Sequence, residues 1–222
     1  TNDEVVQTVK DFGEATRRAI EAGFDGVEIH GANTYLIQQF FSPNSNRRTD
    51  GWGGSLEKRM QFPLAVVKAV TDAVDKYAKR PFIVGYRISP EEIENPGITL
   101  ADTLKLVDAL AQTKLDYLHI SQNHVWRTSA RDKDSKTITN EAIKHHLNGR
   151  LPMIVVGGIQ TAQQAEKVAE NVDLVAIGHG MLWEPKRVQK VVAGDEASIQ
   201  YKVSKAELDE LGIKPTFLDM IA

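Results

Sequence analysis

Two hydrophobic patterns alternate along the chain, one typical of strands and one typical of helices. Apolar residues that alternate with polar ones, or that run continuously, predict strands over 27–30, 82–88, 116–121, 152–158 and 173–179. Apolar residues at helical spacing predict helices over 5–19, 56–77, 99–111 and 140–147, then from 161, from 185 and near 204–211. Because strands and helices take turns, the pattern indicates parallel βαβ units in an α/β fold.

Two architectures are compatible with five such strands. An open doubly wound sheet is comfortable with five, whereas a closed (β/α)8 barrel needs eight strands and typically about 250 residues. Glycines at the ends of the last two strands favour the barrel, because barrel phosphate sites are often built after strands seven and eight. The first strand here would then be the fourth of the barrel. The capping box Thr1–Glu4 at the very start fits a chain that begins inside a barrel.

Composition narrows the class of protein. The 222 residues suffice for a single domain, 1–222, with a short charged tail from about residue 195. A net charge of -3 argues against nucleic acid as a partner. The lack of cysteine excludes disulfides, thiolate catalysis and cysteine-held metal or iron–sulfur sites within the chain. No apolar run is long enough to span a membrane, so we expect no membrane partner and a cytoplasmic location.

The most informative stretch is 26–35, a short strand followed by polar side chains. Val27 and Ile29 face one side of this strand, and Glu28 and His30 face the other. In an open sheet the polar side would face water. In a barrel it would face the interior, and a polar residue at the strand's C-terminal end would lie at the rim where barrels carry out chemistry.

Several sequence blocks resemble a known family. They are GFDGVEIHGANTYL at 23–36, QFFSP at 39–43, NRRTDGWGGSLEKR at 46–59, Arg87, VGGI at 156–159 and IGH at 177–179. In this order they resemble the Old Yellow Enzyme family of FMN-dependent ene-reductases. The resemblance implies the C-terminal part of a (β/α)8 TIM barrel, from about the fourth strand to the eighth. It also implies FMN as cofactor, NADH or NADPH as reductant, and a small electrophilic substrate such as an α,β-unsaturated carbonyl compound.

The resemblance assigns the catalytic roles to His30, Asn33 and Tyr35. His30 and Asn33 would donate hydrogen bonds to the substrate carbonyl oxygen as it gains negative charge. Tyr35 would protonate the α-carbon. Many relatives carry a second histidine where this chain has Asn33. Each residue also has a structural alternative: a core histidine, a left-handed turn residue and a packed loop aromatic.

The resemblance also assigns the cofactor contacts, to Arg87, Gly157, Gly158, Gly178 and His179. Arg87 would face the flavin ring, and the glycines would let backbone N–H groups approach the phosphate. His179 replaces the arginine usual in the family, so we expect weaker phosphate binding. The alternatives are an ion pair of Arg87 with Glu28, turn geometry for the glycines and an ordinary loop histidine.

Further polar residues follow the third strand, and the sequence is also compatible with other functions. His119 and Ser121 on the third strand are interpreted as core polar residues, and His124 and Trp126 as candidates for the substrate side. The chain alone would bind FMN poorly, and we expect a homo-oligomer or self-association through exposed barrel edges. The alternatives are a non-catalytic truncated fragment and another phosphate-binding barrel of aldolase or isomerase type, although no strand ends in the lysine that the latter would favour.

Overall fold

The computed structural model describes residues 1–204, 207–208, 210–214 and 216. The strands are β1 (Gly26–Gly31), β2 (Ile83–Ile88), β3 (Tyr117–Ser121), β4 (Met153–Val156) and β5 (Leu174–Ala176). The α-helices are α1 (Asn2–Glu21), α2 (Leu36–Phe41), α3 (Leu56–Arg59), α4 (Gln61–Tyr77), α5 (Leu100–Leu110), α6 (Thr139–Leu147), α7 (Ala162–Ala169), α8 (His179–Trp183) and α9 (Arg187–Val192). A 3-10 turn follows at Glu196–Ser198.

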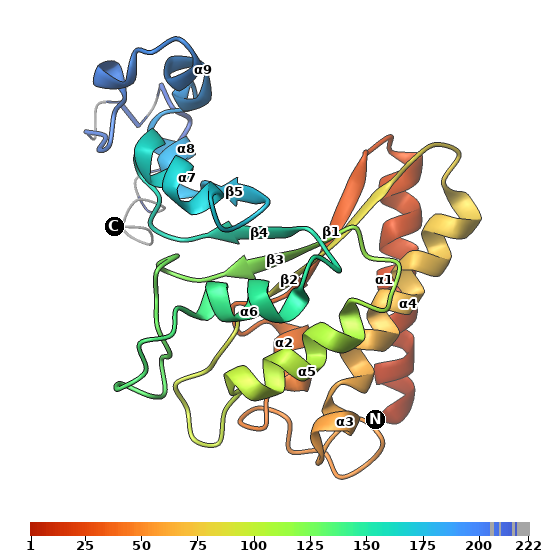
Figure 1. Cartoon of the computed structure of the whole chain (residues 1–222). Helices are drawn as coiled ribbons and strands as arrows, with labels where there is room; N and C mark the ends of the chain where they lie inside the picture. Colours follow the sequence, from red (N-terminus) through yellow and green to blue (C-terminus); the bar gives the residue numbers. More distant parts are fainter. Residues whose placement is uncertain (205–206, 209, 215, 217–222) are drawn as a thin grey trace.

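The five strands form one parallel sheet in the order β1-β2-β3-β4-β5 (Figure 1). A doubly wound sheet reverses its strand order at a switch point, whereas a barrel adds each strand next to the one before it. The sequential order is therefore that of a barrel segment. Right-handed crossovers in such a sheet place the connecting helices on one face.

The core lies between the sheet and these helices. Alternate strand residues, including Val84, Tyr86 and Ile88 of β2, are almost fully buried against helical side chains such as Val66 and Leu106. The other face of the same strands carries polar side chains. The alternation predicted for the first two strands is thus confirmed, and it leaves the polar face as the inner surface of the barrel segment.

The helix starts follow the sequence signals closely. Thr1, Thr99 and Thr161 each cap a helix by accepting a hydrogen bond from the third helical N–H, and each belongs to a capping box. A side-chain cap of this kind stabilises a helix by about 1 kcal/mol. The helices before β1, β3 and β5 are therefore fixed at their N-terminal ends by local sequence.

The structure differs from several sequence predictions, and the fourth strand, predicted over 152–158, is shorter, at Met153–Val156. The helix expected over 56–77 is interrupted at Met60, because Pro63 has no N–H to donate to the carbonyl four residues earlier. The fifth strand ends at Ala176, and His179 instead begins α8. The six-residue helix α2 was not predicted, since it is too short to show a period. The last helix before the tail begins at Arg187 and not at 185. The helix expected near 204–211 includes residues 205, 206 and 209, which lie outside the described residues.

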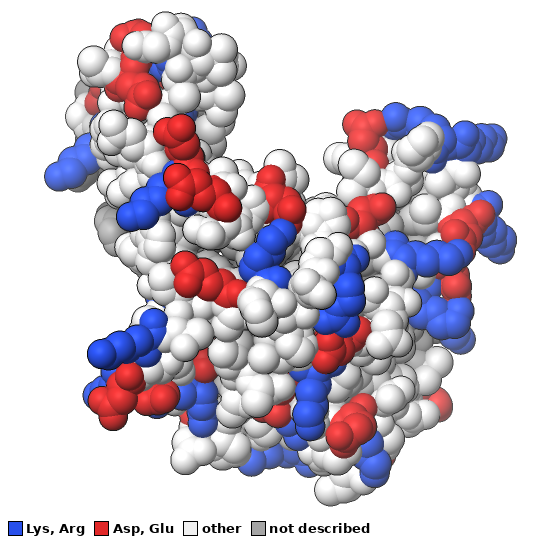
Figure 2. All heavy atoms as spheres, viewed as in Figure 1, with Lys and Arg blue, Asp and Glu red and all other residues white. Residues whose placement is uncertain are grey.

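Charged side chains are spread over the surface without a large area of one sign on the face shown in Figure 2. Among the helices that the structure describes, none has the length and apolar character needed to cross a membrane. The same residues contain no cluster of three His, Asp or Glu side chains that could hold a metal ion.

Candidate functional site

Polar side chains from three neighbouring strands meet on the inner face of the sheet. The register forms two rows across it, Glu28–Gly85–Tyr117 and His30–Arg87–His119. The second row lies toward the C-terminal ends of β1 and β2, which is where barrel enzymes carry their active sites. The first row lies two residues earlier along each strand, and Tyr117 is the first residue of β3.

The Glu28 carboxylate connects the two rows. Its Oε1 accepts a hydrogen bond from Arg87 Nε at 2.6 Å. Its Oε2 lies 2.8 Å from His119 Nδ1 and accepts a hydrogen bond from the Tyr117 hydroxyl at 3.0 Å. The carboxylate is only 22% exposed, so these contacts are poorly screened by water.

These contacts shift the pKa values of Glu28 and Tyr117. Burial alone would raise the pKa of Glu28, but its interactions with His119, Arg87 and Tyr117 outweigh burial and lower the pKa to about 2. Burial and the neighbouring Glu28 carboxylate raise the pKa of Tyr117 to about 12. At neutral pH the row therefore holds a carboxylate and a protonated phenol.

Gly85 is what allows Tyr117 to reach Glu28. A Cβ atom at Gly85 would lie 2.0 Å from the Tyr117 ring, a distance that no real side chain tolerates. The ring of Tyr117 thus crosses β2 through the space that the glycine leaves. The row is built from one residue on each of three strands, and each depends on the other two.

Two roles were considered for Arg87 from the sequence, an ion pair with Glu28 and a contact with the flavin ring, and the structure is compatible with both. Its ion pair with Glu28 is present and uses Nε alone. No hydrogen bond to its two Nη atoms is found among the residues that the structure describes, and Arg87 lines the large cleft of the inner face. Glu28 therefore orients a guanidinium whose remaining donors are free to bind a ligand.

His30 lies at the end of β1 with its ring against that of Tyr35. The two ring centroids are 5.1 Å apart, and the Tyr35 side chain is largely exposed. Burial, assisted by the charge of Arg87, lowers the pKa of His30 below its ordinary value. The ring is thus neutral at pH 7 and has one N–H to donate, while its Nδ1 is buried without a partner among the described residues.

Asn33 is held by two serine hydroxyls from neighbouring strand ends. Its backbone N–H donates to Ser89 Oγ at 3.0 Å, and its Oδ1 accepts from Ser121 Oγ at 3.0 Å and from Ser89 Oγ at 3.4 Å. Because Ser89 accepts one bond from Asn33, its own hydroxyl proton is available to donate back to Oδ1. The amide is thereby oriented, and no partner of its Nδ2 donor is found among the described residues. The backbone of Asn33 is left-handed, with φ 56°, as its turn interpretation expected.

One cleft of about 630 Å³ gathers most of the predicted site residues. Its lining includes Asn33, Arg87, Gly157, Gly158, Gly178 and His179, and it also includes Ser121, which is thus not a core residue. His30 and Tyr35 lie next to each other but outside this lining. The structure therefore joins the predicted cofactor residues and Asn33 in one cleft, and places the other two catalytic candidates beside it.

The glycines after β4 have a structural role as well. Gly157 and Gly158 have φ of 144° and 65°, and a Cβ at Gly157 would lie 2.4 Å from the carbonyl oxygen of Gln122. The loop after β3 therefore packs directly on the Gly157 backbone. Both glycines therefore have the turn geometry considered from the sequence. They also line the cleft.

Arg187 is a residue that sequence reasoning missed. It is only 3% exposed, and its guanidinium donates to the carbonyl oxygens of Gly180 and Gln160. These carbonyls belong to the two segments that close the glycine side of the cleft. Arg187 ties the two together from α9. Nothing in the local sequence distinguishes it from the neighbouring Lys186, because its partners are distant in the chain.

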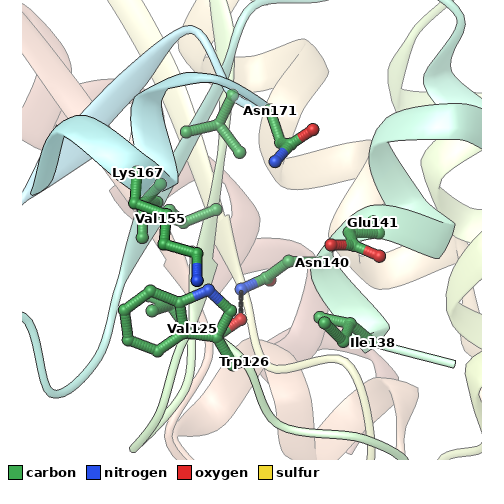
Figure 3. A pocket seen from close by; sticks show the side chains of 10 residues that line it. Val125, Trp126, Ile138, Asn140, Glu141, Val155, Lys167 and Asn171 are labelled. Atoms are coloured by element: carbon green, nitrogen blue, oxygen red, sulfur yellow. Dashed lines mark hydrogen bonds between the residues drawn. The ribbon is translucent and has the colours of Figure 1, made fainter. Parts of the chain in front are cut away.

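Trp126 does not face the cleft. Figure 3 shows it in a separate small pocket, which Val155 of β4 and Lys167 of α7 also line. Asn140 of α6 lies in the same pocket and donates from Nδ2 to the carbonyl oxygen of Val125 at 2.8 Å. The expectation that Trp126 lines the substrate side is thus wrong. His124 instead packs over Gly158.

The chain is similar in sequence to known flavin oxidoreductases. The chain is 52% identical over 201 residues to the probable NADH-dependent flavin oxidoreductase YqiG of Bacillus subtilis, covering 90% of this chain and 54% of that protein. It is 45% identical to the NADH:acrylate oxidoreductase of Vibrio harveyi, covering 90% of this chain and 20% of that protein. The chain thus spans about half of the first relative and about a fifth of the second.

A solved structure and a family model also match flavin oxidoreductases or their fold over most of this chain. A morphinone reductase structure superposes with a TM-score of 0.70 at 29% identity, over 88% of this chain and 50% of that one. The five parallel strands match part of its barrel. The model of the NADH:flavin oxidoreductase / NADH oxidase family matches residues 1–197. The chain belongs to this family, which is also the Old Yellow Enzyme family that its motifs resemble.

Proposed function

We propose that this chain forms the C-terminal part of an FMN-dependent, NAD(P)H-consuming oxidoreductase that reduces activated C=C bonds, as in α,β-unsaturated carbonyl compounds. The observation that carries the proposal is the Asn33 amide, which lines the cleft and whose Oδ1 two serine hydroxyls occupy, so that Nδ2 is left as its donor. A carbonyl oxygen that gains negative charge needs such a donor held in place.

The residues of the cleft fit FMN. A volume of about 630 Å³ lies in the range of small-molecule sites. The Gly157 and Gly158 backbone has no side chain on the cleft side, and the free Nη donors of Arg87 suit the electron-rich edge of a flavin ring. FMN bound there would supply the hydride that adds to the β-carbon of the substrate.

The chain's own residues would do the rest. Asn33 and the neutral ring of His30 would bind the substrate oxygen and stabilise the negative charge that develops on it. The Tyr35 hydroxyl would deliver a proton to the α-carbon, and its exposed position beside His30 leaves it accessible to solvent for reprotonation.

The substrate class rests on these residues and not on the names of relatives. Acrylate and fumarate appear in the names of two relatives, from Vibrio harveyi and Klebsiella pneumoniae. This chain covers only 20% and 22% of those proteins, so other parts of them can handle the named compounds.

The oxidative half-reaction tests the proposal. The protein expressed from its full reading frame is loaded with FMN, reduced with NADH without oxygen and mixed with 2-cyclohexenone. We expect the flavin absorbance to return, and Asn33→Asp, which keeps the shape and the left-handed preference but cannot donate, to slow this return about 100-fold. Asn33→His restores a donor and should recover most of the rate.

The reductive half-reaction is the internal control, because Asn33 is assigned to the substrate oxygen. Its rate with NADH should change little in Asn33→Asp. The proposal fails if the wild-type flavin is not reoxidised by enones, or if Asn33→Asp reoxidises as fast as the wild type. A full-length protein that folds but shows no flavin absorbance after loading would also contradict the proposal.

A further inference from the structure

A second pocket adjoins the cleft at Asn33. Its volume is about 120 Å³, and it shares Asn33, Ser121 and Gln122 with the lining of the large cleft. Ser89, which orients the Asn33 amide, also lines it. A substrate whose carbonyl oxygen lies at Asn33 would therefore have this pocket within reach of its next substituent.

Arg127 is the one cationic side chain among the described residues that line this pocket. Its guanidinium makes no hydrogen bond or ion pair with any residue that the structure describes. The neighbouring Arg131 is different, because its Nη1 donates to the backbone carbonyls of Glu92 and Glu94. Of the two loop arginines, Arg127 is the one whose guanidinium has no bond at all to the described residues, whereas that of Arg131 is tied to the backbone through Nη1.

The backbone of Arg127 is held in place although its side chain is free. Its N–H donates to the carbonyl oxygen of His124 at 3.1 Å, and its own carbonyl accepts from Thr139 at 3.0 Å. An antiparallel bridge between Thr128 and Ile138 closes the loop just beyond it. A guanidinium on a fixed backbone loses less freedom when it binds a ligand than one on a loose loop.

The one carboxylate in the pocket is already bonded. Glu91 lines the pocket, but its Oε1 accepts from the Ser129 hydroxyl at 2.9 Å and its Oε2 from the Ala130 N–H at 2.8 Å. Its contacts are therefore with the loop, and it does not pair with Arg127. The pocket thus presents an unpaired guanidinium to whatever enters it from the cleft.

We propose that Arg127 binds a carboxylate of the substrate, so that this site takes α,β-unsaturated carbonyl compounds that carry an acidic substituent. The proposal rests on the proposed ene-reductase function and names its substrate class. The planar guanidinium matches a carboxylate with two parallel hydrogen bonds, and the pocket of about 120 Å³ has room for a carboxylate. Neutral enones would react at the same centre without using Arg127.

A matched pair of substrates tests this inference. They are 4-oxo-2-pentenoate and its methyl ester, which differ in the negative charge next to the alkene and in one methyl group. We expect Arg127→Gln to raise KM for the acid about ten-fold or more, to leave kcat little changed, and to leave kcat/KM for the ester within about two-fold. Arg127→Lys keeps the charge and should lose less. Lys136→Gln, an exposed cation of the same loop outside the pocket, should change neither substrate.

An equilibrium readout accompanies the kinetics. The saturated acid 4-oxopentanoate should inhibit the wild type competitively, with an inhibition constant about ten-fold higher in Arg127→Gln. The inference is overturned if Arg127→Gln affects acid and ester alike, or neither of them. If the wild type reduces neither compound, the proposed function fails and the inference fails with it, whereas reduction of both without dependence on Arg127 refutes the inference alone.

Discussion

Glu28→Gln is the change that should disturb the inner face most. A glutamine is nearly the same size as a protonated glutamic acid, and it carries no charge to pair with Arg87. Its amide oxygen can still accept from some of Arg87, His119 and Tyr117, but its NH2 group replaces the second carboxylate oxygen and cannot accept from the others. The variant therefore approximates the wild-type fold with Glu28 in its protonated form.

The structure sets the size of this effect. The pKa of Glu28 falls from 4.5 to about 2 in the fold, a difference of about 2.5 pH units, which corresponds to about 3 kcal/mol of stability at pH 7. Because the folded pKa is the lower one, this contribution is fully present above pH 4.5. It is lost as the pH falls from 4.5 through about 2, where the folded carboxylate itself takes up a proton.

The assay is urea denaturation of the wild type and Glu28→Gln at pH 7, 5 and 3.5, followed by circular dichroism. We expect the variant to be about 3 kcal/mol less stable at pH 7 and pH 5, and the gap to shrink to about 2 kcal/mol at pH 3.5. Glu166→Gln, which removes an exposed carboxylate from α7, is the matched control and should show a small gap at every pH. Equal stability at pH 7, or a gap that stays constant down to pH 3.5, would refute the reasoning.

Three further changes test other parts of the site. Gly85→Ala should destabilise the fold by about 1–3 kcal/mol in urea, because the new methyl meets the Tyr117 ring, and the added change Tyr117→Ala should relieve much of this clash. His179→Arg places a permanent charge at the cleft and should lower the Kd for FMN several-fold in a fluorescence titration, whereas the Kd for riboflavin, which has no phosphate, should stay the same. Tyr35→Phe should slow enone-driven flavin reoxidation at least about 100-fold in stopped flow while reduction by NADH continues, and an unchanged reoxidation rate would exclude Tyr35 as the proton donor.

The local sequence was sufficient to predict which side of a strand is polar, because this depends only on the alternation of residues within that strand. The alternation around His30 predicted which side of β1 is polar, and the same alternation placed Arg87 on the inner side of β2. The capping threonines predicted helix starts for the same reason, since a cap is complete within four residues. Resemblance to a family then decided between the open sheet and the barrel, which periodicity alone had left undecided.

Contacts between distant segments could not be predicted in this way. Glu28 meets His119 across 91 positions of sequence, and only the register of three strands shows that they are neighbours. The need for glycine at Gly85 follows from the ring of Tyr117, which is on another strand. The short helix α2 and the orientation of Trp126 likewise depend on packing that no single segment encodes.

The two side chains proposed to bind the substrate oxygen, His30 and Asn33, are both neutral donors. Burial keeps His30 neutral, the Asn33 amide is neutral by nature, and Glu28 compensates part of the charge of Arg87. A substrate oxygen at His30 and Asn33 would thus meet two neutral donors, whose effect depends on their fixed orientation more than on charge. Among the described residues that line the cleft, Arg87 is the one lysine or arginine. Full positive charge in the cleft is therefore concentrated where we propose the flavin to bind, and the substrate oxygen is left to oriented hydrogen bonds.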